Sequence, residues 1–180
     1  MVKNKNVSAG LTWGVILGLI YCLFLYLRWS AATNIAAYAL LAVINYLLIL
    51  GLLFVEAAYR KKSAGGFIEL KELFQTLFIS VLLFELFYAL FDFLYLKWID
   101  PGVIDRMRKA TQVMFDKSTV PISDEQKKST LQAIDSLRQS TQVGNVIQSY
   151  FTYVAVSGVL AFFIALIMRK RKPADTETSK

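Results

Sequence analysis

The residues best suited to chemistry in this sequence are two acids within one apolar stretch, Glu85 and Asp92. Because they are seven residues apart, a helix would present both on one face, about 10 Å apart along its axis, with Tyr88 between them. A charged side chain at the centre of a bilayer costs about 2.5–3.5 kcal/mol to insert, and such residues usually mark ion or proton pathways. The pattern therefore indicates either a proton-transfer site or a structural hydrogen bond to a neighbouring helix.

Two polar side chains on other apolar stretches complete this candidate intramembrane site, Arg28 and Asn45. Arg28 lies at the depth that we expect for Asp92, and its long side chain can reach inwards to form an ion pair. The hydroxyls of Thr152 and Tyr153 reach a similar depth and are the alternative partners of Asp92. Asn45 lies near mid-membrane, where we expect it to hydrogen-bond between helices rather than to bind a ligand.

The composition argues against several other kinds of chemistry. The sequence has no histidine, which is the commonest metal ligand and general base near neutral pH, and a single cysteine, Cys22. It contains no phosphate-binding glycine loop, no serine-nucleophile motif and no cluster of metal ligands. We therefore expect no enzymatic activity, no metal and no cofactor. The net charge of +7 comes from residues beside the apolar stretches, so we expect no nucleic-acid binding.

Four apolar stretches are long enough to hold these residues inside a membrane, namely residues 7–29, 35–58, 76–98 and 146–168. A spanning helix needs about 20 predominantly apolar residues, and a backbone in lipid must satisfy its own hydrogen bonds. Of the 180 residues, 56% are hydrophobic and 18% charged, against about 45–50% and about 25% in an average soluble domain. The predicted fold is all-α, a polytopic membrane protein with four transmembrane helices.

Basic residues beside the spans indicate their orientation. If both termini are cytoplasmic, all of the predicted cytoplasmic flanks fall on the same side of the membrane. The basic residues of these flanks are Arg60, Lys61, Lys62, Arg169, Lys170, Arg171 and Lys172. This predicts a multi-pass protein of the cell inner (plasma) membrane with N- and C-termini in the cytoplasm. The alternative for the first span is a cleaved signal peptide, although its apolar run exceeds the usual length of about 7–15 residues.

The segments between the spans divide the chain further. Residues 1–98 contain the first three spans. The second and third spans are joined by a short cytoplasmic link, residues 59–75, with a turn at Gly65-Gly66 and an amphipathic helix after it. Residues 99–145 predict an extracytoplasmic helical hairpin. Asp100-Pro101 supplies the N-cap and first residue of its first helix, and Ser123 opens a capping box for its second. Residues 146–172 contain the last span, and residues 173–180 form a polar cytoplasmic tail.

Small residues recur every four positions on two of the spans, a spacing that lets helices approach closely in lipid. They are Gly10, Gly14 and Gly18 on the first span and Ser157, Ala161 and Ala165 on the last. We expect these ridges to pack helices within one chain, with dimerisation as the alternative. The bilayer is the expected partner. A homo-oligomer or a membrane-protein partner would bind through the outer hairpin or the glycine ridge.

Several short motifs occur in a characteristic order. They are a glycine-bearing first span (residues 10–19), a basic link continuing into Gly65-Gly66-Phe67-Ile68, a helix ending in Lys97-Trp98-Ile99-Asp100-Pro101, a charged helical insert, and a last span closed by residues 169–172. This order resembles an uncharacterised family of bacterial membrane proteins, found mainly in Bacteroidetes, named domain of unknown function 4199. The resemblance covers nearly the whole chain. It implies a four-helix inner-membrane protein and no particular activity.

Two functions therefore remain open. The favoured one is a non-enzymatic structural or accessory membrane protein that binds partners through the outer hairpin. The alternative is a small proton-linked transporter or channel that uses the intramembrane acids of the third span. A water-accessible cavity reaching both carboxyl groups would favour transport, whereas a dry and fully paired site would favour a structural role.

Overall fold

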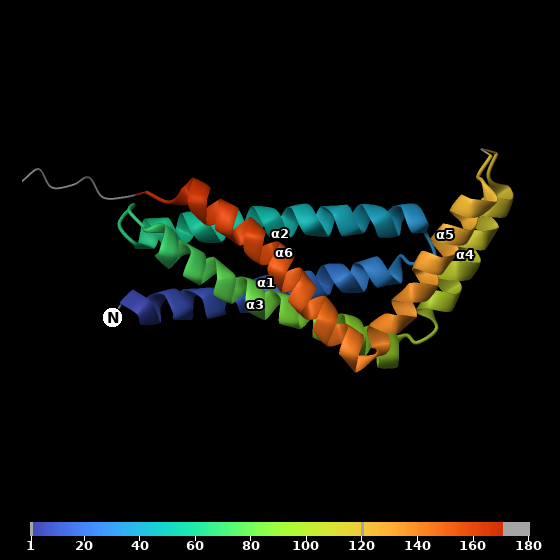
Figure 1. Ribbon diagram of the computed structural model, residues 1–180, viewed down its shortest axis with the longest axis horizontal. Coiled ribbons are helices and arrows are strands. Elements are labelled where there is room, and N and C mark those ends of the chain that lie inside the picture. Colours follow the sequence, from blue (N-terminus) through green and yellow to red (C-terminus); the bar gives the residue numbers. More distant parts are fainter. Residues whose placement is uncertain (1, 120, 171–180) are drawn as a thin grey trace, which may run out of the picture.

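Four long helices form the body of the molecule (Figure 1). The structure, a computed structural model, describes residues 2–119 and 121–170. The long helices are α1 (Val2–Ser30), α2 (Ile35–Ser63), α3 (Leu70–Leu94) and α6 (Val143–Met168). Each is long and apolar enough to cross a membrane, which confirms the predicted all-α fold and its four spans. The helices extend up to six residues beyond the predicted spans, since hydropathy marks where the apolar segment ends and not where the helix ends.

Helix α3 is the central helix of this bundle. It packs along α1 on one side and against α6 on another, while α1 also contacts α2. Its buried residues recur at helical spacing on one face and fill the core together with residues of the other three helices. They include Leu73, Leu77, Val81 and Phe84. Large apolar side chains also cover the outer faces of all four helices, as expected for surfaces that face lipid.

The connections between α1 and α2 and between α2 and α3 are both short. Residues 31–34 join α1 to α2, whose N-cap is Asn34. Residues 64–69 join α2 to α3, and Gly65 and Gly66 have φ angles of +77° and +86°, a region that favours glycine. The amphipathic helix predicted in this link is not a separate element. Its residues from Leu70 onward form the first turns of α3, because their helical spacing runs directly into that of the span, whereas residues 67–69 precede the helix.

The link also contacts the end of the last helix. The backbone N–H of Ile68 donates to the carbonyl of Lys170 (2.9 Å), and the N–H of Lys170 donates back to Ile68 (3.2 Å). The start of α1 and the end of α6 lie at the same end of the bundle, where the end of α2 with its basic residues is also found (Figure 1). The predicted flanking residues Arg171 and Lys172 and the predicted tail, residues 173–180, lie outside the described residues.

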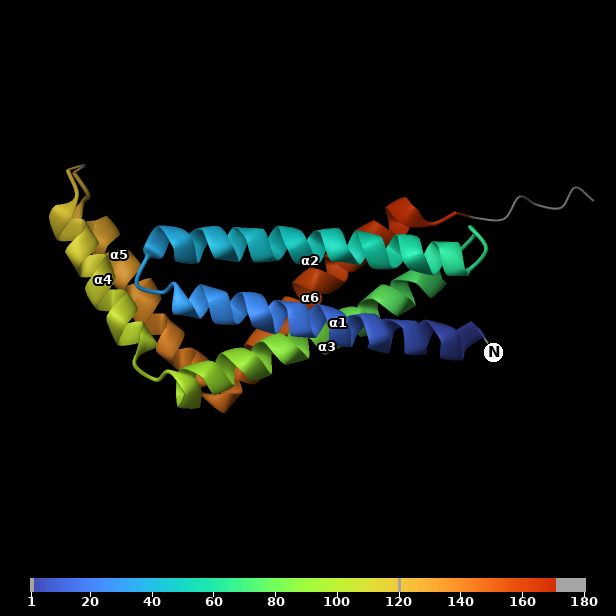
Figure 2. The same ribbon diagram turned by 180° about the vertical axis from the view of Figure 1, so that it is seen from behind.

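An arm of two helices extends from the opposite end of the bundle. It consists of α4 (Val103–Lys117) and α5 (Asp124–Ser136), joined to the bundle by a π-helical turn, Tyr95–Ile99, and a 3-10 turn, Leu137–Thr141. Both views show α4 and α5 side by side and inclined to the long helices (Figures 1 and 2). A second apolar cluster lies at the base of the arm and fixes it to the bundle. Its buried members are Trp29, Ala32, Tyr38, Tyr95, Leu96, Val103, Ile104, Met107 and Ile134.

The caps of the two arm helices differ from each other. The capping box at Ser123 is confirmed. The hydroxyl of Ser123 accepts from the backbone N–H of Gln126 (3.2 Å), and the side-chain oxygen of Gln126 accepts from the backbone N–H of Ser123 (3.2 Å). The predicted cap at Asp100-Pro101 is wrong, because α4 begins at Val103 with Gly102 as its N-cap.

The cause of this shift is the π-helical turn before α4. The N–H of Asp100 donates to the carbonyl of Tyr95 (2.8 Å), so Asp100 ends that turn instead of starting the next helix. Its carboxylate pairs with Arg106 in the first turn of α4. A wider helical turn of this kind leaves no clear signal in the residue types, which is why the sequence placed the start of α4 too early.

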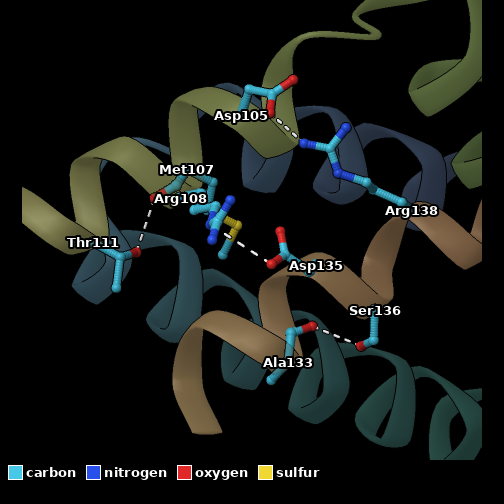
Figure 3. A network of polar contacts seen from close by, with 8 residues as sticks. All are labelled: Asp105, Met107, Arg108, Thr111, Ala133, Asp135, Ser136 and Arg138. Carbon is cyan, nitrogen blue, oxygen red and sulfur yellow. Dashed lines mark hydrogen bonds and ion pairs between the residues drawn. The ribbon is translucent and has the colours of Figure 1, made fainter. Parts of the chain in front are cut away.

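Ion pairs connect the two layers of the arm. Arg138 pairs with Asp105, and Arg108 Nε lies 3.6 Å from Asp135 Oδ2 (Figure 3). All four side chains are about half exposed, so each pair adds little stability and chiefly fixes how α5 and the 3-10 turn that contains Arg138 lie on α4.

Candidate functional site: buried carboxyl groups along the bundle

Three carboxyl groups, one more than the sequence singled out, lie inside the bundle at successive levels of α3. The additional one is Glu56 of α2, which is 0% exposed. The Oγ of Ser80 on α3 lies 2.6 Å from its Oε1 and 2.9 Å from the carbonyl of Gly10 on α1. A hydroxyl has one proton and serves one acceptor at a time. The Ser80 hydroxyl therefore links α1, α2 and α3 through alternative hydrogen bonds.

The glycine ridge makes this contact possible by letting α1 lie directly against α3. A Cβ at Gly10 would lie 2.6 Å from the carbonyl oxygen of Thr76, and a Cβ at Gly14 would lie 3.1 Å from the Cα of Ser80. A Cβ at Gly18 would lie 2.7 Å from the ring of Phe87. All three glycines thus face a helix of the same chain, as expected for packing within the monomer.

The second level is Glu85, which is 3% exposed and is joined to α6. The hydroxyl of Ser157 donates to its Oε1 at 2.6 Å. Ser157 was expected only to pack helices, whereas Ala161 and Ala165, one and two turns further along α6, are fully buried in the apolar core. The second oxygens of both Glu56 and Glu85 are buried without a hydrogen-bond partner among the described residues.

Tyrosine rings fill the space between Glu85 and the third level. Tyr88, predicted between the two acids, stacks on Tyr21 of α1 with ring centroids 4.9 Å apart. Its other neighbour is Tyr153 of α6, edge to face at 5.3 Å. Three helices therefore meet here through aromatic faces.

The third level is Asp92, and its partner is one that the sequence did not indicate. The indole Nε1 of Trp29 donates to Asp92 Oδ1 at 2.8 Å. The expected pairing with Arg28 is wrong, since the Arg28 guanidinium lies 4.3 Å from the ring centroid of Tyr38 on α2. Neighbouring helical residues point about 100° apart, so Trp29 faces α3 while Arg28 faces α2.

The alternative expectation of hydroxyl partners for Asp92 is also wrong. The hydroxyl of Thr152 donates to the carbonyl of Gln148 within its own helix, at 2.9 Å. Tyr153 contributes its ring to the wall beside Asp92 rather than a hydrogen bond.

A pocket of about 120 Å³ opens beside Asp92 at the arm end of the bundle. Its polar and aromatic lining includes Arg28, Tyr38, Tyr88, Asp92, Ser149 and Tyr153. Glu85 does not line it. The pocket reaches one of the two predicted carboxyl groups and not the other, so the site is neither a continuous cavity nor a dry and fully paired cluster.

Asn45 and Arg60 each differ from the role that the sequence indicated. Asn45 is buried on α2, yet its Oδ1 has no hydrogen-bond partner within residues 2–119 and 121–170, so it does not join helices as expected. Arg60, expected as an exposed basic flank, is buried and donates to the side chain of Asn6 on α1. It also donates to Ser63 Oγ at 3.3 Å. A basic residue one turn from a helix end can turn inwards when a neighbouring helix offers an acceptor.

In the part of the chain that the structure describes, no three metal-binding side chains gather at one place.

Comparison with known proteins identifies the family and nothing more detailed. None of the curated proteins matches the chain significantly, and none of the solved structures does. A family model matches residues 12–170, which include most of α1 and all of the other helices. The chain therefore belongs to the family of proteins of unknown function DUF4199.

Proposed function

We propose that this protein is a non-enzymatic accessory protein of the inner membrane that binds a membrane-protein partner through its arm. The observation that carries the proposal is the arm itself, which a four-helix bundle does not need for its own packing. Its base is fixed by the second apolar cluster, whereas α4 exposes Val113 and Met114 further along. These two neighbouring side chains form a small exposed apolar patch, and exposed apolar side chains on a helix outside the bundle are typical contacts of a protein-binding surface.

The proposed orientation places the arm outside the cytoplasm and both termini inside it. It is supported by the basic residues Arg60, Lys61, Lys62, Arg169 and Lys170, which lie at the end of the bundle opposite the arm. Basic residues in short flanks favour the cytoplasmic side. The arm also contains basic residues, but acidic ones balance them, as in the pairs of Figure 3.

The orientation is tested with single cysteines in a chain that carries Cys22→Ser. Lys117→Cys at the end of α4 should react with a membrane-impermeant maleimide in intact cells, and Lys62→Cys should react only after the cells are opened. The reverse pattern would contradict the proposed orientation.

Partner binding is tested by placing a photo-crosslinking amino acid at Val113. In native membranes this position should give one discrete protein adduct, and the adduct should disappear when Met114→Glu puts a charge into the patch. The same amino acid at Leu40, an exposed lipid-facing position on α2, is the matched control and should give lipid adducts only. Equal labelling from both positions, or an adduct unaffected by Met114→Glu, would overturn the proposal. An adduct with the mass of two chains would identify the partner as a second copy.

A second candidate function is proton-linked transport. It is supported by the series Glu56, Glu85 and Asp92, three groups that can carry protons along the length of α3. In liposomes that contain a pH-sensitive dye, transport would appear as a proton flux that Glu56→Gln and Glu85→Gln both reduce. The accessory function predicts no flux above that of protein-free liposomes.

A further inference from the structure

We propose that the pocket at Arg28 and Asp92 binds the head group of one phospholipid that carries both a phosphate and a primary ammonium. The glycerol backbone and the first carbons of one acyl chain of this lipid lie in the adjoining apolar groove between α3 and α6. The proposal concerns a specific site on this chain and not the general contact of a spanning helix with lipid. It is independent of the partner proposed for the arm.

The first argument is the state of Arg28. Its Nε is buried and has no hydrogen-bond partner among the described residues, and no described carboxylate lies within ion-pair distance of it. Its closest aromatic neighbour is the face of the Tyr38 ring, 4.3 Å from the guanidinium carbon. Arg28 as a whole is half-buried. A guanidinium held partly out of water without an ion-pair partner is costly, and a guanidinium binds phosphate oxygens through two parallel hydrogen bonds. A phosphate in the pocket would supply the missing acceptors.

The second argument is the opposite charge beside it. Asp92 lines the same pocket, and its described hydrogen bond is to the neutral indole of Trp29 through Oδ1. The rings of Tyr88 and Tyr153 form the adjacent wall. A carboxylate next to aromatic faces favours a small cation with N–H donors. A ligand with a phosphate and an ammonium a few bonds apart would therefore satisfy both Arg28 and Asp92.

The third argument is the groove next to the pocket. A hollow of about 260 Å³ between α3 and α6 is lined by apolar surface from Leu86, Leu90, Phe93, Val143 and Ile147. Ala89 and Val146 line both the groove and the polar pocket, so these two short side chains form the border between them. The ligand class with a charged end and a long apolar end is a phospholipid.

The position of the site along the helices is the fourth argument. Arg28 lies two residues from the end of α1, Tyr38 lies in the first turn of α2 and Val146 lies in the first turn of α6. The polar pocket is therefore at the level where head groups meet the apolar core of a bilayer. Its volume is several times the roughly 10–15 Å³ that a single water needs.

The test compares lipids of identical acyl chains by native mass spectrometry of the full chain in detergent. Phosphatidylethanolamine should bind as a single retained molecule, about tenfold more tightly than phosphatidylglycerol, which lacks the ammonium. Phosphatidylcholine, whose quaternary ammonium has no N–H donors, should bind with intermediate affinity. Soluble phosphoethanolamine should compete only weakly, because it lacks the acyl chain. Equal binding of the ethanolamine and glycerol lipids would overturn the proposed head-group recognition, and tight binding of phosphoethanolamine alone would overturn the role of the groove.

Variants localise the site. Arg28→Gln and Asp92→Asn should each remove the preference for phosphatidylethanolamine, and Ile147→Asn should weaken binding of the whole lipid. The matched control is Lys97→Gln, which removes an exposed cation at the same end of the bundle and should leave the preference unchanged. If Lys97→Gln abolishes the preference and Arg28→Gln does not, the site is wrong. The comparison of lipids on the unmodified chain stands even where a variant fails to fold.

Discussion

Trp29 and Asp92 join α1 to α3 through a hydrogen bond of 2.8 Å from the indole nitrogen to a carboxylate oxygen. The same indole ring is 3% exposed and lies in the apolar cluster at the base of the arm, stacked on Tyr95 with centroids 6.1 Å apart. Trp29 thus connects the membrane-embedded carboxyl group with the packing that holds the arm. One side chain couples the candidate site to the arm.

Replacing Trp29 with phenylalanine keeps much of the ring packing and removes the donor to Asp92. We expect Trp29→Phe to lower the free energy of unfolding in detergent by about 1–3 kcal/mol, because a partly buried carboxylate oxygen loses its partner. Reversible unfolding in mixed detergent micelles measures this change. Trp98→Phe is the control, since Trp98 is 64% exposed and should change stability by less than about 0.5 kcal/mol. Similar losses for both variants would show that the hydrogen bond has no special importance.

The error over the partner of Asp92 shows what residue types can and cannot predict. The four spans follow from hydropathy, which is a local property of each stretch. The choice between Arg28 and Trp29 depends instead on the rotation of α1 about its axis. That rotation is set by the glycines that lie against α3, so it is fixed only when two helices are known to pack together.

The contact between α1 and α3 gives a prediction for the glycine ridge. Gly14→Ala would place a Cβ 2.8 Å from the Cβ of Leu83, and the two helices would have to move apart. We expect a loss of about 1–3 kcal/mol in the free energy of unfolding, the usual cost of overpacking. Gly51→Ala on α2 is the matched control, because a Cβ added there would meet no neighbouring atom within 4 Å and the change should be close to neutral. A destabilising Gly51→Ala together with a neutral Gly14→Ala would contradict this packing.

Glu56 illustrates a second limit of the sequence. It lies near the end of a predicted span, where an acid ordinarily reaches the aqueous interface, so its position gave no reason to expect burial. Helix α2 continues to Ser63, which leaves Glu56 two turns from its end and next to Ser80 of α3. The signal that could have indicated this is the absence of any break in helical character after Glu56.

The contact between Ser80 and Glu56 gives the third prediction. Ser80→Ala removes the partner of a fully buried carboxyl group, and we expect it to lower the free energy of unfolding by about 0.5–2 kcal/mol. Adding Glu56→Met should recover part of this loss, since an apolar side chain needs no partner. A double-mutant cycle by unfolding in detergent measures the coupling. Strictly additive losses would mean that the two side chains do not depend on each other.

The arm allows apolar packing to be compared with ion pairing within one element. Ile134 of α5 is buried against the base of the arm, so Ile134→Ala should lower the stability of the arm by about 2–4 kcal/mol through lost packing and a cavity. Asp105→Asn removes the pair with Arg138 (Figure 3), and a half-exposed ion pair contributes only about 0–1 kcal/mol. Hydrogen exchange of α4 and α5 amides measures both effects directly. Faster exchange in Ile134→Ala with nearly unchanged exchange in Asp105→Asn is the expected result. The opposite ranking would mean that charge, and not the apolar cluster, holds the arm to the bundle.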